Sequence, residues 1–166
     1  MGENGMGEHV LTASTRIALP RAELFEFFAD AGNLERLTPP ELRFRILTPP
    51  PIAMAAGTVI DYRLRLFGKS FRWKTLISRW EPGVLFVDEQ LEGPYARWVH
   101  THSFHDAAGG TLVTDDVRYR LPLFPFGEVA LPVVRLQLRR IFAYRARRIG
   151  ELLGTAVTEG ADRGEG

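Results

Sequence analysis

From Leu42 to Leu121 the chain consists of short alternating segments separated by proline and glycine. Apolar and polar residues alternate there with a period of two, which is the pattern of a strand with one buried face. The turn residues recur at a spacing typical of an antiparallel sheet. The expected strands are residues 43–47, 58–67, 71–80, 84–91, 95–104 and 111–121. This region is therefore predicted to be a six-strand antiparallel meander.

One strand and two short helices are expected before the meander. Residues 9–19 alternate as a strand does, and residues 22–30 carry apolar side chains at helical spacing. Pro20 suits the first turn of that helix. Residues 34–37 add one more turn, which Pro39 and Pro40 end because proline cannot continue a helix.

A long amphipathic helix is expected after the meander. Residues 133–153 carry an apolar stripe at helical spacing, and Gly154 is a suitable stop. The stripe consists of Val134, Leu138, Ile141, Phe142, Ile149, Leu152 and Leu153. A strongly twisted sheet curls, and this helix is the element that can cover its concave side. Such packing tends to leave a cavity between sheet and helix.

Composition limits the function classes. The 166 residues suit a single domain, expected over residues 9–154, with disordered tails at 1–8 and 155–166. The net charge of +1 gives no electrostatic case for nucleic acid. The chain has no cysteine and no apolar run of membrane-spanning length, and its glycine-rich first residues are not expected to act as a signal peptide. We expect a soluble, cytoplasmic protein.

Local sequence motifs indicate a resemblance to a known family. These motifs comprise Asp88-Glu89-Gln90, Gly93-Pro94-Tyr95, Trp98, His100, His102, Phe104, Gly110-Thr111, Asp115, Val117, Tyr119 and Leu121-Pro122. With the order of elements, it resembles the START, polyketide-cyclase and aromatase superfamily, also called SRPBCC. The resemblance implies an α+β helix-grip fold, in which six to seven antiparallel strands wrap around the C-terminal helix. It also implies a small hydrophobic ligand or a cyclase/dehydratase reaction, although one fold hosts unrelated activities.

The candidate site lies on the strand that carries two histidines. Trp98, His100, His102 and Phe104 share one face of this strand, because side chains alternate across a sheet. If residues 105–110 form the next loop, His100 lies opposite Asp115. Opposite side chains are about 5 Å apart at Cβ, within reach of a hydrogen bond.

The preceding strand is expected to add Glu89 to that surface. If Gly93-Pro94 is a two-residue turn, Glu89 lies opposite Trp98 and shares the more apolar face of its strand. A slip of one residue would move Glu89 to the other face. Arg79, if it points inward, could meet Glu89 or a ligand carboxylate.

Three interpretations of the histidines follow. Asp115 could orient His100, which would then move protons in an enolisation, aldol cyclisation or dehydration without a cofactor. Alternatively, His100 and Asp115 satisfy each other in an apolar interior, or only position a ligand. His100 and His102 could both reach a metal ion, with Glu89 or Asp115 as a third ligand. Local spacing fixes no third ligand, so we expect no metal and no cofactor.

Aromatic residues indicate the ligand class. A cavity lined by aromatic rings and a few polar groups suits a small hydrophobic or aromatic ligand. The expected ligand-binding residues are Tyr62, Trp73, Glu89, Trp98, His102, Phe104, Tyr119, Phe124 and Phe126.

The apolar connection 122–132 supports a rival class of function. It could be a lid that brings Phe124 and Phe126 to the cavity mouth, or an apolar tip that touches a membrane or partner. The second case would make the chain a peripheral membrane or lipid-handling protein. Basic residues nearby are not dense enough to hold the protein on an anionic surface, so the lid is favoured.

Overall fold

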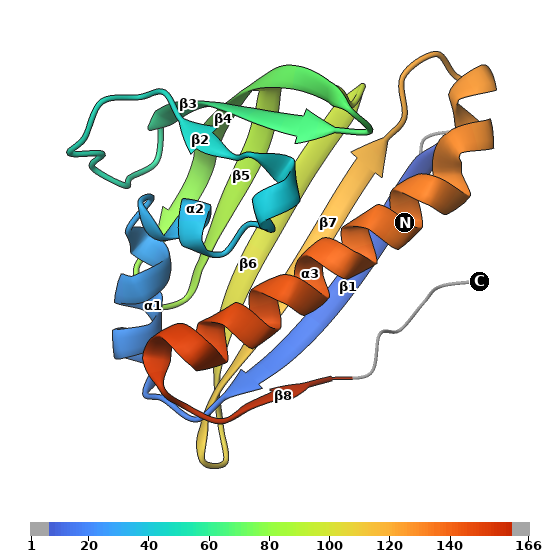
Figure 1. Cartoon of the computed structure of the whole chain (residues 1–166). Coiled ribbons are helices and arrows are strands. Elements are labelled where there is room, and N and C mark those ends of the chain that lie inside the picture. The colour runs from blue at the N-terminus through green and yellow to red at the C-terminus, as the bar shows by residue number, and fades with distance from the viewer. Residues whose placement is uncertain (1–6, 161–166) are drawn as a thin grey trace.

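The protein, seen here as a computed structural model that describes residues 7–160, is an open antiparallel sheet crossed by one long helix (Figure 1). The first elements are β1 (Glu8–Ile17), α1 (Arg21–Ala29), α2 (Asn33–Arg36) and the 3-10 helix η1 (Pro40–Leu42). The meander follows as β2 (Arg45–Ile46), β3 (Val59–Leu66), β4 (Lys69–Glu81), β5 (Leu85–Glu92), β6 (Arg97–Ala107) and β7 (Gly110–Arg120). The last elements are the 3-10 helix η2 (Phe126–Ala130), α3 (Leu131–Leu153) and β8 (Val157–Glu159).

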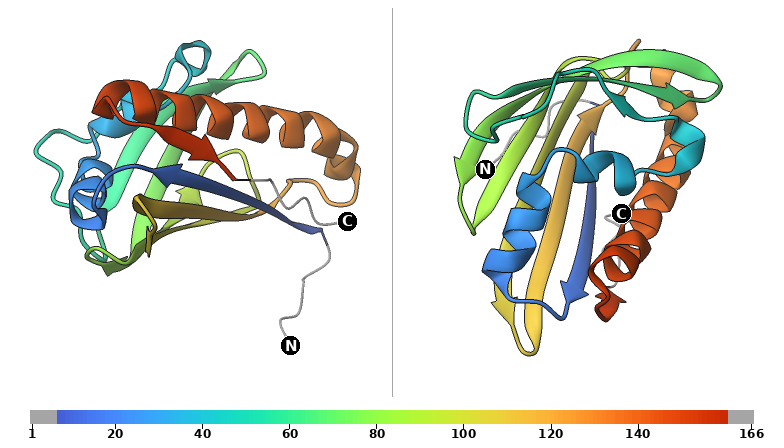
Figure 2. Two further views of the ribbon diagram at one scale, coloured as in Figure 1. Left: turned by 90° about the horizontal axis from the view of Figure 1, so that it is seen from below. Right: turned by 60° about the vertical axis from the view of Figure 1, so that its left-hand side comes forward.

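The sheet has the order β2-β3-β4-β5-β6-β7-β1-β8, so the first strand lies beside the last strand of the meander. Figure 2 shows α3 as a layer over one face of this sheet, with α1 and α2 on the same side. These observations confirm the α+β helix-grip fold. The expected helix 133–153 begins two residues earlier, with Pro132 in its first turn, where the missing N–H costs no hydrogen bond.

The eighth strand corrects the expected C-terminal tail. Residues 155–166 were predicted to be disordered, but Val157–Glu159 pair with Thr15–Ile17 of β1. Gly154 ends α3 in the left-handed conformation, and the chain then turns back along β1. Glu8, also assigned to a tail, belongs to β1. The remaining tail predictions concern residues 1–6 and 161–166, which lie outside the described residues.

The hairpin of β6 and β7 is tighter than expected. Ala107 pairs with Gly110, so Ala108 and Gly109 form the turn instead of residues 105–110. A Cβ at Gly110 would lie 2.1 Å from the carbonyl oxygen of Ile17, so only glycine allows β1 this close. The register is shifted by two residues, which keeps every side chain on its predicted face.

The register of β5 against β6 differs by one residue, which reverses the faces of β5. Asp88 pairs with His100 and Glu89 with Val99. The connection is wider than a two-residue turn, and within it the Gln90 side chain donates a hydrogen bond to the backbone oxygen of Tyr95 at 2.7 Å. Asp88 therefore faces the interior where Glu89 was expected.

The buried apolar residues form two clusters under the helices. One lies between β3, β4, β6, β7 and α3, and includes Trp73, Trp98 and Leu138. The other joins α1 to the sheet through Phe25, Phe28, Phe86 and Phe104. Among the described residues, no helix is long and apolar enough to cross a membrane.

Candidate functional site

A cavity of about 190 Å³ lies between the sheet, the three α-helices and η1. Its wall is mainly apolar, and strands β3 to β6 supply the aromatic side chains Tyr62, Trp73, Phe86 and Trp98. The Tyr62 and Trp73 rings stack at 5.9 Å, and Trp98 meets Trp73 edge to face at 5.3 Å. The cavity is thus shaped by fixed aromatic side chains on rigid strands.

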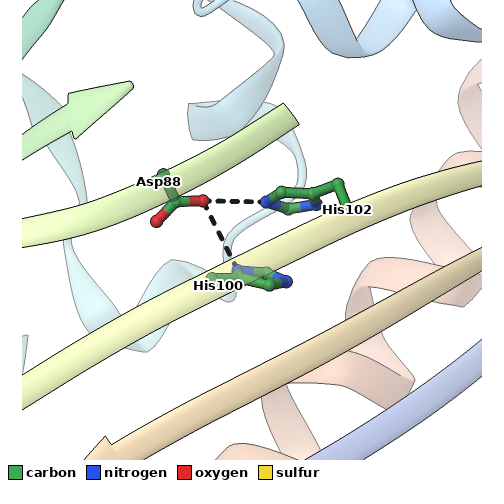
Figure 3. A group of neighbouring side chains, drawn as sticks. All are labelled: Asp88, His100 and His102. Atoms are coloured by element: carbon green, nitrogen blue, oxygen red, sulfur yellow. Dashed lines mark hydrogen bonds and ion pairs between the residues drawn. The ribbon is translucent and has the colours of Figure 1, made fainter. Parts of the chain in front are cut away.

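A buried polar cluster interrupts this apolar wall. His100 and His102 leave the same face of β6, and their rings lie 3.7 Å apart. Asp88 Oδ2 on β5 lies 2.8 Å from His102 Nε2 and 3.6 Å from His100 Nδ1 (Figure 3). Two strands therefore bring both imidazoles to one carboxylate at the cavity wall.

A second carboxylate contacts the other side of both rings. Asp115 Oδ1 on β7 accepts a hydrogen bond from His100 Nε2 at 2.8 Å. His102 Nδ1 lies 2.9 Å from the same oxygen, an ionic contact with poorer geometry than a hydrogen bond. The contact expected between His100 and Asp115 is thus present, although His102 is the residue paired directly with Asp115.

The charges of this cluster do not cancel without a further cation. Two carboxylates carry −2, and the nearby Arg145 guanidinium, which lowers the pKa of both, carries +1. One proton on an imidazole would make the sum zero. A doubly protonated His102 would also supply a donor to each aspartate.

The pKa directions favour His102 over His100 as the site of that proton. Burial lowers the pKa of His102, but the contacts with Asp115 and Asp88 outweigh it, and the net pKa is raised. Burial and the neighbouring His102 hold the pKa of His100 below its usual value. Burial raises the pKa of Asp115, yet Arg145 and the two imidazoles hold it well below its usual range. The cluster therefore favours the neutral form of His100 and the protonated form of His102.

A second cavity of about 220 Å³ lies behind the cluster, between β1 and α3. Asp115 lines this second cavity, whereas Asp88, His100 and His102 line the first. Arg145 lines both, and its guanidinium carbon lies 5.2 Å above the Phe28 ring. The histidine pair therefore stands between a ligand-sized space and its supporting carboxylate.

Five of the predicted site residues line the first cavity. They are Tyr62, Trp73, Trp98, His100 and His102. Tyr62 bonds Thr75 through their hydroxyls at 3.0 Å. Trp73 Nε1 is buried and has no hydrogen-bond partner among the described residues. It is available as a donor to a ligand.

Three predicted residues of the sheet lie elsewhere. Glu89 faces away from the cavity because of the one-residue shift described above. Phe104 is on the predicted face but packs under α1, against Phe25 and Phe28. Tyr119 is fully buried among His9, Tyr95 and Trp98 and does not line the cavity. Phe104 and Tyr119 fill the core because the inner face of the sheet extends beyond the cavity.

Phe124 and Phe126 also lie away from the cavity. Glu128 of η2 accepts a hydrogen bond from His9 Nε2 at 2.7 Å, which ties η2 to the start of β1. Figure 1 shows that this end of the sheet is remote from α1 and α2, which line the cavity. Phe126 is 82% exposed and Phe124 48% exposed. The prediction that 122–132 forms a lid is therefore wrong for this conformation.

Arg79 does not point inward. A bulge between Ile77 and Arg79 ends the alternation of β4, and Arg79 instead pairs with Glu81 at the surface. An inward alternation continues only through Phe71, Trp73, Thr75 and Ile77 of that strand.

Sequence reasoning missed two charged residues of the site. Asp88 is two residues from Phe86, the largest side chain of β5, and the alternation from Phe86 would have placed it inside. Arg145 follows Leu138, Ile141 and Phe142 at helical spacing, so the stripe of α3 could have included it.

This geometry defines a helix-grip protein with a mainly apolar cavity and a polar cluster in its wall. Residues 17–142, more than half of the chain, match the family described as polyketide cyclase / dehydrase and lipid transport. The chain belongs to this family. Comparison with curated proteins gave no match.

Solved structures share the fold at low sequence identity. Ms6760 from Mycobacterium smegmatis is 17% identical, with a TM-score of 0.64 over 87% of this chain and 90% of its own. TTHA0849 from Thermus thermophilus is 20% identical, with a TM-score of 0.65 over 86% and 95%. The ginseng major latex-like protein 151 from Panax ginseng is 14% identical, with a TM-score of 0.60 over 86% and 95%. These likenesses show the fold alone.

Proposed function

We propose that this protein binds one small aromatic or apolar ligand that carries a polar group. The observation that supports this proposal is the aromatic cavity with a histidine–aspartate cluster in its wall. The rings of Tyr62, Trp73 and Trp98 offer flat apolar surface, which suits a planar ligand. Membership of a family whose description includes lipid transport agrees with an apolar ligand.

Two polar positions support an oxygen-bearing ligand. Trp73 Nε1 is a buried donor without a partner among residues 7–160, and a buried donor gains when a ligand acceptor reaches it. His100 and His102 lie on the same cavity wall. A carbonyl, hydroxyl or carboxylate would therefore be oriented at the polar wall while the rest of the ligand contacts aromatic rings.

Filling part of the cavity should weaken binding without unfolding the protein. Ile141 of α3 lines the cavity and is only partly buried, so Ile141→Phe places the added volume where the ligand would lie. We expect anilinonaphthalene sulfonate, an aromatic probe with one anionic group, to quench the tryptophan emission of the wild-type protein. Its affinity should fall about tenfold or more in the variant, equivalent to about 1.4 kcal/mol.

The matched control for this experiment is Phe126→Ser. Phe126 is exposed and outside the cavity, so probe affinity should stay within twofold of the wild-type value. Equal affinity in wild type and Ile141→Phe would contradict the proposed binding site. A loss of probe affinity in Phe126→Ser would instead support the interpretation of residues 122–132 as a lid. The membrane alternative stays a prediction, and liposome sedimentation of Phe126→Ser against wild type tests it.

A cofactor-independent cyclase or dehydratase reaction is the second candidate. The hydrogen bond between His100 Nε2 and Asp115 favours it, because it leaves the second ring nitrogen of His100 for a ligand proton. The step would transfer a proton from the carbon beside a ligand carbonyl to His100 Nδ1, forming an enolate that Trp73 or His102 could stabilise.

Hydrogen–deuterium exchange would detect this step. An enolisable aromatic ketone in deuterated water should exchange its α-hydrogens faster with the wild-type protein than without it. His100→Gln should remove about 10²- to 10⁴-fold of that acceleration. His105→Gln, an exposed histidine of the same strand, should keep it. Exchange that is equally fast in both variants would exclude His100 as the base.

A further inference from the structure

Three potential metal-ligand atoms lie close together at the cavity wall. Asp88 Oδ2 lies 2.8 Å from His102 Nε2 and 3.6 Å from His100 Nδ1, and the ligand atoms of the three residues lie within 4.8 Å of one another (Figure 3). Ligand atoms around tetrahedral zinc are separated by about 3.3 Å, given bonds of about 2.0–2.1 Å. We propose that Asp88, His100 and His102 bind one divalent transition-metal ion, with the remaining coordination position open to the cavity.

The outer nitrogens of both imidazoles are already supported. Asp115 Oδ1 lies 2.8 Å from His100 Nε2 and 2.9 Å from His102 Nδ1. Metal-binding histidines commonly donate their second ring N–H to a carboxylate, which orients the ring and fixes the tautomer. With a proton on each outer nitrogen, each inner nitrogen presents a lone pair on the side of Asp88.

Burial and charge also suit a cation here. The side chains of His100, His102 and Asp115 are each less than one-tenth exposed. Buried charges require compensation by pairing or by a metal. Asp88 and Asp115 outweigh Arg145 by one negative charge, which a divalent metal ion would compensate. The resulting site would carry +1, which favours an anionic oxygen at the open position.

This inference reverses the expectation drawn from the sequence. Without a third ligand at fixed spacing, His100 and His102 were insufficient to predict a metal. The register of β5 supplies Asp88 in place of Glu89 and completes a two-histidine, one-carboxylate set on two rigid strands. An ion held there would polarise a ligand oxygen that enters from the aromatic cavity. The ligand class thereby narrows to molecules that offer a carbonyl or an ionised hydroxyl.

Metal titration of the full chain, without any organic ligand, tests this proposal. After treatment with a chelator, the wild-type protein should bind one Co²⁺ with visible absorption bands of a low-coordinate site, and one Zn²⁺ by calorimetry. Asp88→Asn should weaken Zn²⁺ binding at least 100-fold, because it replaces the anionic carboxylate ligand by a neutral amide. Asp115→Asn should weaken it about 10- to 100-fold through loss of ring support.

Two neighbouring substitutions serve as matched controls. Glu89→Gln changes the adjacent acid on the outer face of β5, and His105→Gln changes an exposed histidine of β6. Both should bind Zn²⁺ as the wild-type protein does. The proposal is overturned if the wild-type protein shows no saturable one-to-one binding, or if Asp88→Asn binds as tightly as Glu89→Gln.

Histidine ring NMR of the wild-type protein provides a test that needs no variant. One equivalent of Zn²⁺ should shift the ring signals of His100 and His102 and leave those of His9 and His105 in place. Shifts confined to His9 or His105 would overturn the proposal. Probe binding in the cavity is measured on metal-free protein, so failure of the metal site remains distinguishable from failure of ligand binding.

Discussion

Asp115→Ala is expected to lower the free energy of unfolding by about 3–5 kcal/mol, because it leaves the outer ring nitrogens of His100 and His102 buried without their carboxylate partner. Asp115 is nine-tenths buried and contacts His100 Nε2 and His102 Nδ1 through one oxygen. Alanine removes both contacts and the charge that balances Arg145. Urea unfolding of metal-free protein at pH 7 measures the effect.

Two variants separate charge from packing. Asp115→Asn keeps an acceptor for His100 and nearly the same volume, so its loss should be smaller. Asp116→Ala removes the next carboxylate, which lies at the outer face of β7 and bonds Thr12 and Arg118. It should cost less than about 1 kcal/mol, as exposed ion pairs do. A loss equal to that of Asp115→Ala would show that the cluster has no special stabilising role.

The same substitution should change the acid limb of the stability curve. The pKa of Asp115 is held well below its usual range in the folded protein. A lowered folded-state pKa contributes stability above the unfolded value of about 3.9, and this contribution disappears as pH falls through the folded-state pKa. The difference between wild type and Asp115→Ala should therefore shrink toward strongly acidic pH.

The architecture was accessible from sequence because its signals are local and repeated. Alternation with period two predicted β3, β4, β6 and β7, and the apolar stripe predicted α3 within two residues at its start. The face of β6 that carries Trp98, His100 and His102 also follows from period two alone. Each of these predictions tolerates an error in the length of a neighbouring turn.

The composition of the site was less accessible because it depends on register between strands. The predicted β6–β7 register was wrong by two residues, which still placed Asp115 on the inner face. The predicted β5–β6 register was wrong by one residue, which placed Glu89 on the inner face where the structure has Asp88. The connection between these strands contains a contact of the Gln90 side chain with the Tyr95 backbone, which local propensity does not predict. Because of that one-residue error, the sequence did not predict Asp88 as the third potential metal ligand.

Phe104→Ala is expected to give the other large loss, about 3–5 kcal/mol, as a buried aromatic ring is replaced by a void. Phe104 is 1% exposed and meets the Phe25 and Phe28 rings edge to face at 5.1 and 5.3 Å. Phe67→Ala is the matched control, because Phe67 is 60% exposed and should cost under about 0.5 kcal/mol. Since Phe28 also lines the cavity below Arg145, relaxation of α1 should weaken probe binding as well. Equal unfolding energies for the two variants would contradict the assignment of Phe104 to the core.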